Sequence, residues 1–186
     1  MHLRRVLAVG FASALALAHY GCGGIPEPVP EPSFYRIMAQ PGAQLDGAAA
    51  ASMISGYRKN NGLGDISVDP VLMRAAEQQA RAMARRDKLD HNAGGPFAQR
   101  MKSSGYAYKV GAENIGAGYH TLAEAFSGWR DSPPHRANML LKGVTQMGIA
   151  AVYDPNTKYK VFWALIVAAP ADSGSAALAP AEVVAR

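Results

Sequence analysis

Three ionisable residues that are far apart in the chain could share one chemical site: His91, Glu113 and His135. Two imidazoles and a carboxylate can ligate zinc and leave a fourth position for water or substrate. Each residue also has a purely structural interpretation. His91 can cap the end of a helix, Glu113 can be a carboxylate at a strand edge, and His135 can belong to the first turn of a helix. Only the fold can bring the three side chains together.

A serine nucleophile is the second kind of chemistry to weigh, because Ser132 lies three residues before His135. A catalytic serine needs a base within hydrogen-bond reach and a third group that orients the base. Ser132 precedes Pro133 and Pro134, so we expect it to cap a helix, with its hydroxyl accepting from the His135 N–H. A hydroxyl occupied in this way is not a nucleophile. Cys22, the only cysteine, is no better a nucleophile, because it precedes a Pro-rich stretch and lies outside the predicted domain.

Two further residues are secondary candidates for the wall of such a site. His120 follows a glycine-rich stretch and could support a ligand, although we favour an exposed ring for a loop histidine. Asn114 is better placed to hydrogen-bond than to react. Glu124 is not a spare carboxylate, because it completes a capping box with Thr121.

Helical periodicity predicts four helices that could position these residues. The first runs from about Leu45 to a stop at 60–62, and the second begins at Asp69, with Pro70 in the first turn. The third begins at Thr121 and the fourth at Ser132. Apolar residues at helical spacing mark the first three of them: Ala49, Met53, Ile54 and Tyr57; Leu72, Ala75, Ala76, Ala80 and Met83; Leu122, Ala125, Phe126 and Trp129.

The second half of the domain is predicted to be β-structure. Residues 144–153 and 158–167 are two strand-like runs joined by an Asp-Pro-Asn-Thr turn, and a third strand is expected near 106–115. Helices followed by a hairpin indicate an α+β fold in which helices cover a small antiparallel sheet.

Four separated segments resemble the signatures of bacterial CAP domains, the superfamily of cysteine-rich secretory, antigen 5 and pathogenesis-related proteins. They are Leu89-Asp90-His91, Gly111-Ala112-Glu113-Asn114-Ile115, Trp129-x-x-Ser132-Pro133-x-His135-Arg136-x-Asn138 and Met147-Gly148-Ile149-Ala150. Their order and intervals are typical of the family. The resemblance implies an α-β-α sandwich with a small central antiparallel sheet and an open cleft, over residues 45–170.

The resemblance also implies a ligand set. Many members hold two histidines and two glutamates in the cleft and can bind a divalent metal there. By the motifs, His91 and His135 match the histidines and Glu113 matches one glutamate, while Ser132 stands where the other would be. The implied cofactor is therefore a weakly held, zinc-like divalent ion.

The N-terminal part of the chain predicts export. Residues 1–21 have a basic start and a short apolar run, as in a signal peptide, and residues 22–44 are a Pro-rich tether. Cys22 follows His19-Tyr20-Gly21, which is similar to a lipoprotein box and favours a lipid anchor in the membrane. Cleavage after Ala18 and soluble secretion is the alternative. Residues 171–186 are expected to be a disordered tail.

The charge and the candidate residues limit the function. The formal net charge is +5, and loss of Arg4 and Arg5 with the signal leaves +3, which is too mild to predict nucleic-acid binding. We expect a non-enzymatic envelope module that binds a small apolar ligand, a glycan or a protein. A metal-dependent hydrolase using His91, Glu113 and His135 is the alternative, and a purely structural domain is the third possibility.

Overall fold

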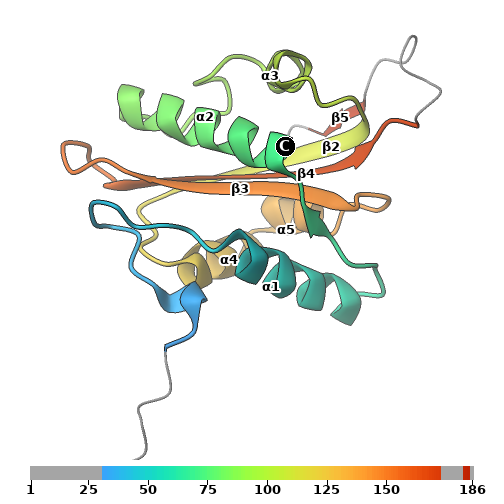
Figure 1. Ribbon diagram of the computed structural model, residues 1–186, viewed down its shortest axis with the longest axis horizontal. Helices are drawn as coiled ribbons and strands as arrows, with labels where there is room; N and C mark the ends of the chain where they lie inside the picture. The colour runs from blue at the N-terminus through green and yellow to red at the C-terminus, as the bar shows by residue number, and fades with distance from the viewer. Residues whose placement is uncertain (1–30, 173–181, 185–186) are drawn as a thin grey trace, which may run out of the picture. The chain divides into compact units, whose positions relative to one another are not determined.

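A central β-sheet lies between two layers of helices (Figure 1). The computed structural model describes residues 31–172 and 182–184. Helices α2 (Pro70–Arg86) and α3 (Phe97–Ser104) cover one face of the sheet. Helices α1 (Gly47–Asn60), α4 (Leu122–Asp131) and α5 (Pro133–Met139) cover the other. The predicted α+β class and α-β-α layering are confirmed.

The sheet is mixed, with an antiparallel centre. Its order is β1-β3-β4-β2-β5, and the three central strands run antiparallel. The two short edge strands are parallel to their neighbours, which the sequence did not indicate. The strands are β1 (Ser67–Val68), β2 (Tyr108–Ala117), β3 (Gln146–Tyr153), β4 (Val161–Pro170) and β5 (Glu182–Val184).

A hydrophobic core lies on each face of the sheet, and strand β4 contributes side chains to both. It can do so because successive side chains of a strand point to opposite faces of the sheet. One set packs toward α1 and α4, and the alternate set packs toward α2. The first set is Val161, Trp163, Leu165 and Val167, and the second is Phe162, Ala164, Ile166 and Ala168. A strand covered on both faces can therefore be apolar at every one of these positions.

Helix α2 begins where the sequence predicts and packs very close to the sheet. The Asp69 carboxylate accepts hydrogen bonds from the N–H groups of Val71 and Leu72, at 2.8 and 2.9 Å. A Cβ atom added to Gly148 on β3 would overlap the Leu72 carbonyl. Gly148 therefore allows the helix backbone to lie directly against the strand.

Helix α4 also has the predicted cap and buried stripe. The Thr121 hydroxyl accepts from the Glu124 N–H at 3.1 Å, while the Glu124 carboxylate accepts from the His120 N–H rather than from that of Thr121. Trp129 is 1% exposed and donates its indole N–H to the Ile115 carbonyl at 3.0 Å. Its predicted place in the core is confirmed.

A buried arginine joins α1 to the far end of the sheet. Arg58 is 2% exposed, and its guanidinium donates to the carbonyls of Met139, Leu141 and Val144 at 2.9 to 3.0 Å. Its Nε donates to the Gly64 carbonyl. Burial lowers the pKa of Arg58. One side chain thus satisfies carbonyls at the end of α5 and in the approach to β3.

The structure adds elements where none was predicted. Helix α3 lies between Pro96 and Gly105, whose φ of 80° ends it in the left-handed region. The Phe34 region forms a short 3-10 turn (Ser33–Tyr35), and Met38 is buried, with its N–H bonded to the His120 carbonyl at 2.7 Å. The packed chain therefore begins before residue 45, within the predicted tether.

The predictions for the two ends fall mostly outside the described residues. The signal segment 1–21 and Cys22 lie outside them, as does most of the predicted tail 171–186. Within that tail, Glu182–Val184 pair in parallel with β2 as β5. In the described part of the chain, no helix has the length and apolar character needed to cross a membrane.

Candidate functional site

The fold brings His91 and Glu113 into direct contact. His91 lies in the turn after α2, and Glu113 is in the middle of β2. The Nδ1 atom of His91 is 2.9 Å from the Oε1 atom of Glu113. The buried Gln79 side chain holds the turn, donating to the carbonyls of Asp90 and His91 at 2.9 and 3.1 Å. Its own carbonyl accepts from the Gly94 N–H. A side chain from the middle of α2 therefore fixes the position of His91.

Arg100, from the helix that was not predicted, takes the other oxygen of Glu113. Its Nη2 lies 2.7 Å from Oε2, and the two side chains are only 8% and 3% exposed. The same guanidinium donates to the carbonyls of Gly95 and His91. Each oxygen of the Glu113 carboxylate thus has a partner. A carboxylate engaged in this way is not a free metal ligand, which differs from the role that the family resemblance implied.

The contact with Glu113 determines which nitrogen of neutral His91 carries hydrogen. An ionised carboxylate only accepts hydrogen bonds, so Nδ1 must be the donor. Nε2 is then left with its lone pair, able to accept a hydrogen bond or to ligate a metal. The His91 side chain is 39% exposed, so this face of the ring can meet a ligand.

His135 lies close to this pair at the start of α5. It is half-buried, and burial, followed by the charge of His91, lowers its pKa. Two amides join its helix to β2. Asn114 donates to the His135 carbonyl at 2.9 Å, and Asn138 donates to the Asn114 side chain at 3.0 Å and to the Glu113 carbonyl at 3.1 Å. Asn114 therefore has a structural contact within this network.

Ser132 does not make the predicted cap. It is the N-cap residue of α5, but its hydroxyl forms no capping hydrogen bond, because Pro133 and Pro134 provide no N–H groups and the remaining first-turn donor, His135, is not reached. In residues 31–172 the hydroxyl also makes no hydrogen bond to the His135 ring. The arrangement of a serine nucleophile and its base is therefore not formed.

His120 lies apart from this network. Its backbone bonds to Glu124 and Met38, its side chain is exposed, and no hydrogen bond of its ring is found in the described residues. These contacts fit the exposed position favoured from the sequence. They do not make His120 a partner of His91, Glu113 or His135.

The predicted three-ligand metal site does not fit the arrangement of Glu113. Among the described residues, no group of three or more His, Cys, Asp or Glu side chains is placed to hold a metal ion. Glu113 instead orients His91 and neutralises Arg100. The two imidazoles remain as nitrogen donors, near enough for the charge of His91 to lower the pKa of His135, and two donors alone would hold an ion only weakly.

Sequence reasoning missed Arg100 and Gln79, which hold the site together. Pro96 and Gly105 are start and stop signals that could have indicated α3. Nothing local distinguishes Arg100 from an exposed arginine, since its partner Glu113 is 13 residues away. Asn138 was part of a recognised motif, but its contact with Asn114 needed the fold.

Comparison with known proteins identifies the domain. The model of the cysteine-rich secretory protein family, CAP, matches residues 51–167, more than half of the chain. The uncharacterized protein YkwD of Bacillus subtilis is 34% identical over 98 residues, which are 51% of this chain and 38% of that protein. The chain therefore spans well under half of the length of this curated relative.

Solved structures show the same fold. An extracellular protein of Bacillus anthracis that contains an SCP domain superposes with a TM-score of 0.59 and 21% identity, over 66% of this chain and 39% of that one. An outer surface protein of Borrelia burgdorferi superposes with a TM-score of 0.61 and 17% identity, over 70% of this chain and 99% of that one. At these identities the likeness shows the architecture alone.

Proposed function

This chain belongs to the cysteine-rich secretory protein family, and we propose that it is an exported, non-enzymatic binding module of the cell envelope. The signal-like start and Cys22 support export, with lipid anchoring favoured over soluble secretion. The relatives described as an extracellular protein and an outer surface protein support the same location. The ligand that we propose for the His91 site is a small apolar molecule, a glycan or a protein surface.

The engagement of Glu113 is the observation that carries the choice of binding over catalysis. Hydrolysis through an activated water needs an acid or base free to exchange protons with that water. The Glu113 carboxylate is buried between Arg100 and His91, so its charge is committed to structure. In residues 31–172, no other carboxylate contacts either imidazole.

A divalent, zinc-like ion is proposed as a weak component of the site. His91 and His135 would hold it, with Glu113 orienting His91 through Nδ1. When bound, such an ion would supply a Lewis-acidic contact for an oxygen of the ligand. The depressed pKa of His135 keeps that imidazole neutral and therefore able to bind metal.

Calorimetric titration of the purified protein with zinc tests this site. His91→Ala and His135→Ala should each abolish binding, and His120→Ala is the matched control that should not change it. Glu113→Gln leaves Arg100 without its counter-charge, so circular dichroism must first show that it folds; the folded variant should bind zinc about 10- to 100-fold more weakly, because Glu113 orients a ligand. Binding should also weaken as the pH falls below 6.5 toward the lowered pKa of His135, because a protonated imidazole cannot ligate a metal. Unchanged zinc binding in His91→Ala would show that the two-histidine site is wrong.

Ser132→Glu provides a gain-of-function test. It restores the carboxylate that the family resemblance implies, so zinc should bind more tightly. Since the Ser132 hydroxyl makes no capping bond, the metal-free protein should keep its stability. Zinc-dependent ester hydrolysis that is lost in both His91→Ala and His135→Ala would instead favour the hydrolase. Native mass spectrometry of protein purified from its own envelope would identify a co-purified ligand.

A further inference from the structure

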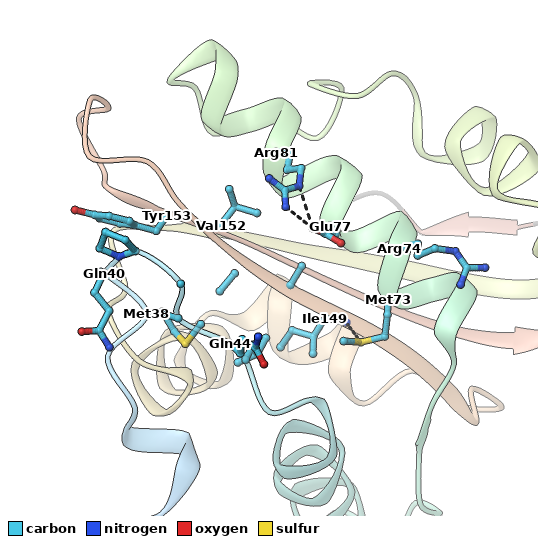
Figure 2. A pocket seen from close by; sticks show the side chains of 16 residues that line it. Met38, Gln40, Gln44, Met73, Arg74, Glu77, Arg81, Ile149, Val152 and Tyr153 are labelled. Carbon is cyan, nitrogen blue, oxygen red and sulfur yellow. Dashed lines mark hydrogen bonds and ion pairs between the residues drawn. The ribbon is translucent and has the colours of Figure 1, made fainter.

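A groove of about 550 Å³ lies along the outer edge of β3 (Figure 2). Residues 149–153 of β3 form its floor, the first half of α2 forms one wall, and residues 38–45 contribute to the other. None of its lining residues belongs to the His91 site, which β4 separates from this edge of the sheet.

The floor of the groove is an unpaired strand edge. Strand β1 pairs only with Gln146 and Met147, and the chain then leaves the edge for α2. The last bond on this side runs from the Asp69 N–H to the Met147 carbonyl, at 2.9 Å. In the described part of the chain, residues 149–153 have a strand partner on the β4 side alone.

The alternation of backbone groups shows which ones face the groove. The Met147 carbonyl points to the β1 side, and the Ile149 N–H also faces away from β4. Because backbone groups of alternate residues point to the same side of a strand, the N–H and C=O groups of Ala151 and Tyr153 also face away from β4. Asp154, one residue further, donates its N–H to Lys160 on the opposite side. The groove is therefore lined by backbone donors and acceptors at every second residue.

One of these donors already has a substitute partner. The Ile149 N–H donates to the Sδ atom of Met73, at 3.2 Å. A thioether is a weak acceptor on a flexible side chain, so a peptide carbonyl could displace it with a gain in hydrogen-bond strength. The Ala151 groups have no backbone partner among the described residues. Such a row of open groups is a template for an added strand.

We propose that this groove binds an extended peptide segment of a partner protein, which adds to the sheet as a strand beside β3. The open edge of residues 149–153 suits a segment of about five residues. The exposed Arg74 forms no ion pair in the described residues, whereas Arg81 is held by Glu77 at 2.6 Å. Arg74 therefore selects a peptide with an acidic residue.

The groove walls decide between a peptide and a second copy of the chain. The open edge is recessed between α2 and residues 38–45, as Figure 2 shows. A single strand can enter this space. The sheet edge of a second copy of this chain cannot enter as easily, because helical layers cover both faces of its sheet. Met73, which is partly exposed, lines the groove and can adapt to different apolar side chains of the peptide.

Selection from a phage-displayed library of random peptides on the purified protein tests the proposal. Enriched peptides should combine alternating apolar residues with an acidic residue. Ala151→Pro removes an outward N–H at a free edge, and Arg74→Glu reverses the selecting charge; each should weaken binding of the synthesised peptides by about tenfold or more. Arg85→Glu, the same charge change on an exposed part of α2 outside the groove, should leave their affinity unchanged.

Three outcomes would overturn the proposal. The first is no enrichment, and the second is peptides that bind the Arg74→Glu variant as tightly as wild type. The third is a dimer of the unliganded protein in sedimentation that Ala151→Pro dissociates, because the edge would then serve a second copy. If circular dichroism shows that Ala151→Pro does not fold, Arg74→Glu and N-methylated peptides are used in its place. Methylation at alternate residues removes backbone N–H donors of the added strand, so these peptides should bind more weakly.

Discussion

The buried contact between Arg100 and Glu113 defines the chemistry of the His91 site. A charge pair this deeply buried gains much of its stability from mutual neutralisation, and removal of either partner leaves an uncompensated charge. Glu113 has its second oxygen on His91, so the same pair also selects the tautomer of an exposed imidazole. Positioning of His91, a proposed ligand of the site, is thus linked to the stability of the domain.

His135 should make the stability of the protein depend on pH. Burial, and after it the charge of His91, lowers its pKa below the ordinary value of 6.5. The folded state therefore binds fewer protons than the unfolded state once the pH falls below 6.5. The free energy of unfolding should keep this contribution above pH 6.5 and lose it as the pH falls toward the folded pKa.

Urea unfolding at a series of pH values in wild type and in His135→Asn measures this effect. The variant cannot titrate at this position, so its unfolding free energy should fall less steeply below pH 6.5. His120→Asn, at an exposed position, is the control and should keep the wild-type dependence. If the unfolding free energies of wild type and His135→Asn depend on pH in the same way, protonation of His135 does not destabilise the folded protein.

At the level of elements, the contact between α2 and β3 is closer than ordinary helix–sheet packing. The Leu72 backbone occupies the space that a side chain on Gly148 would need. This contact places Met73 against the Ile149 N–H and so shapes one wall of the groove. The same helix holds the turn of His91 through Gln79, about two turns further along.

Gly148→Ala should therefore destabilise the protein by about 1–3 kcal/mol or more, because the added methyl group must push the helix away from the strand. Gly56→Ala is the matched control. No atom lies within 4 Å of the Cβ position of Gly56, which is in the interior of α1, so alanine should be neutral or stabilising by up to about 1 kcal/mol. Chemical denaturation measures both. Equal stability of the two variants would contradict the close contact.

For the whole molecule, one sheet carries two separate candidate sites. The His91 site uses β2 and the helix ends around it, while the groove uses the free edge of β3, and β4 lies between the two strands. The two proposals thus give the domain a site for a small ligand and, separately, a site for a partner protein.

Export and anchoring are tested on the chain with its N-terminal segment. Cys22→Ser removes the thiol that lipidation requires and should move the protein from the membrane fraction to the soluble exported fraction. Cell fractionation followed by immunoblotting measures how the protein is distributed. Ser13→Ala, a small substitution in the apolar segment before Cys22, is the control. Equal solubility of wild type and Cys22→Ser would favour plain secretion over a lipid anchor.

Elements with local signals could be predicted before the fold was known. Asp69-Pro70 begins α2, Thr121 begins α4, and the turn before β4 separates two apolar strands, because caps and turns are made by residues within a few positions of one another. Motif order was sufficient for the family, since it needs no knowledge of contacts. The α-β-α layers followed from these two kinds of information.

The contacts of the candidate site residues could not be predicted in this way. Glu113 became the partner of Arg100 and His91 because β2, α3 and the turn after α2 meet there, and no local rule relates residues 13 or 22 positions apart. The free edge of β3 likewise depends on where β1 leaves the sheet. Burial and hydrogen bonding between distant segments are properties of the packed chain, so a site made from them exists only once the chain has folded.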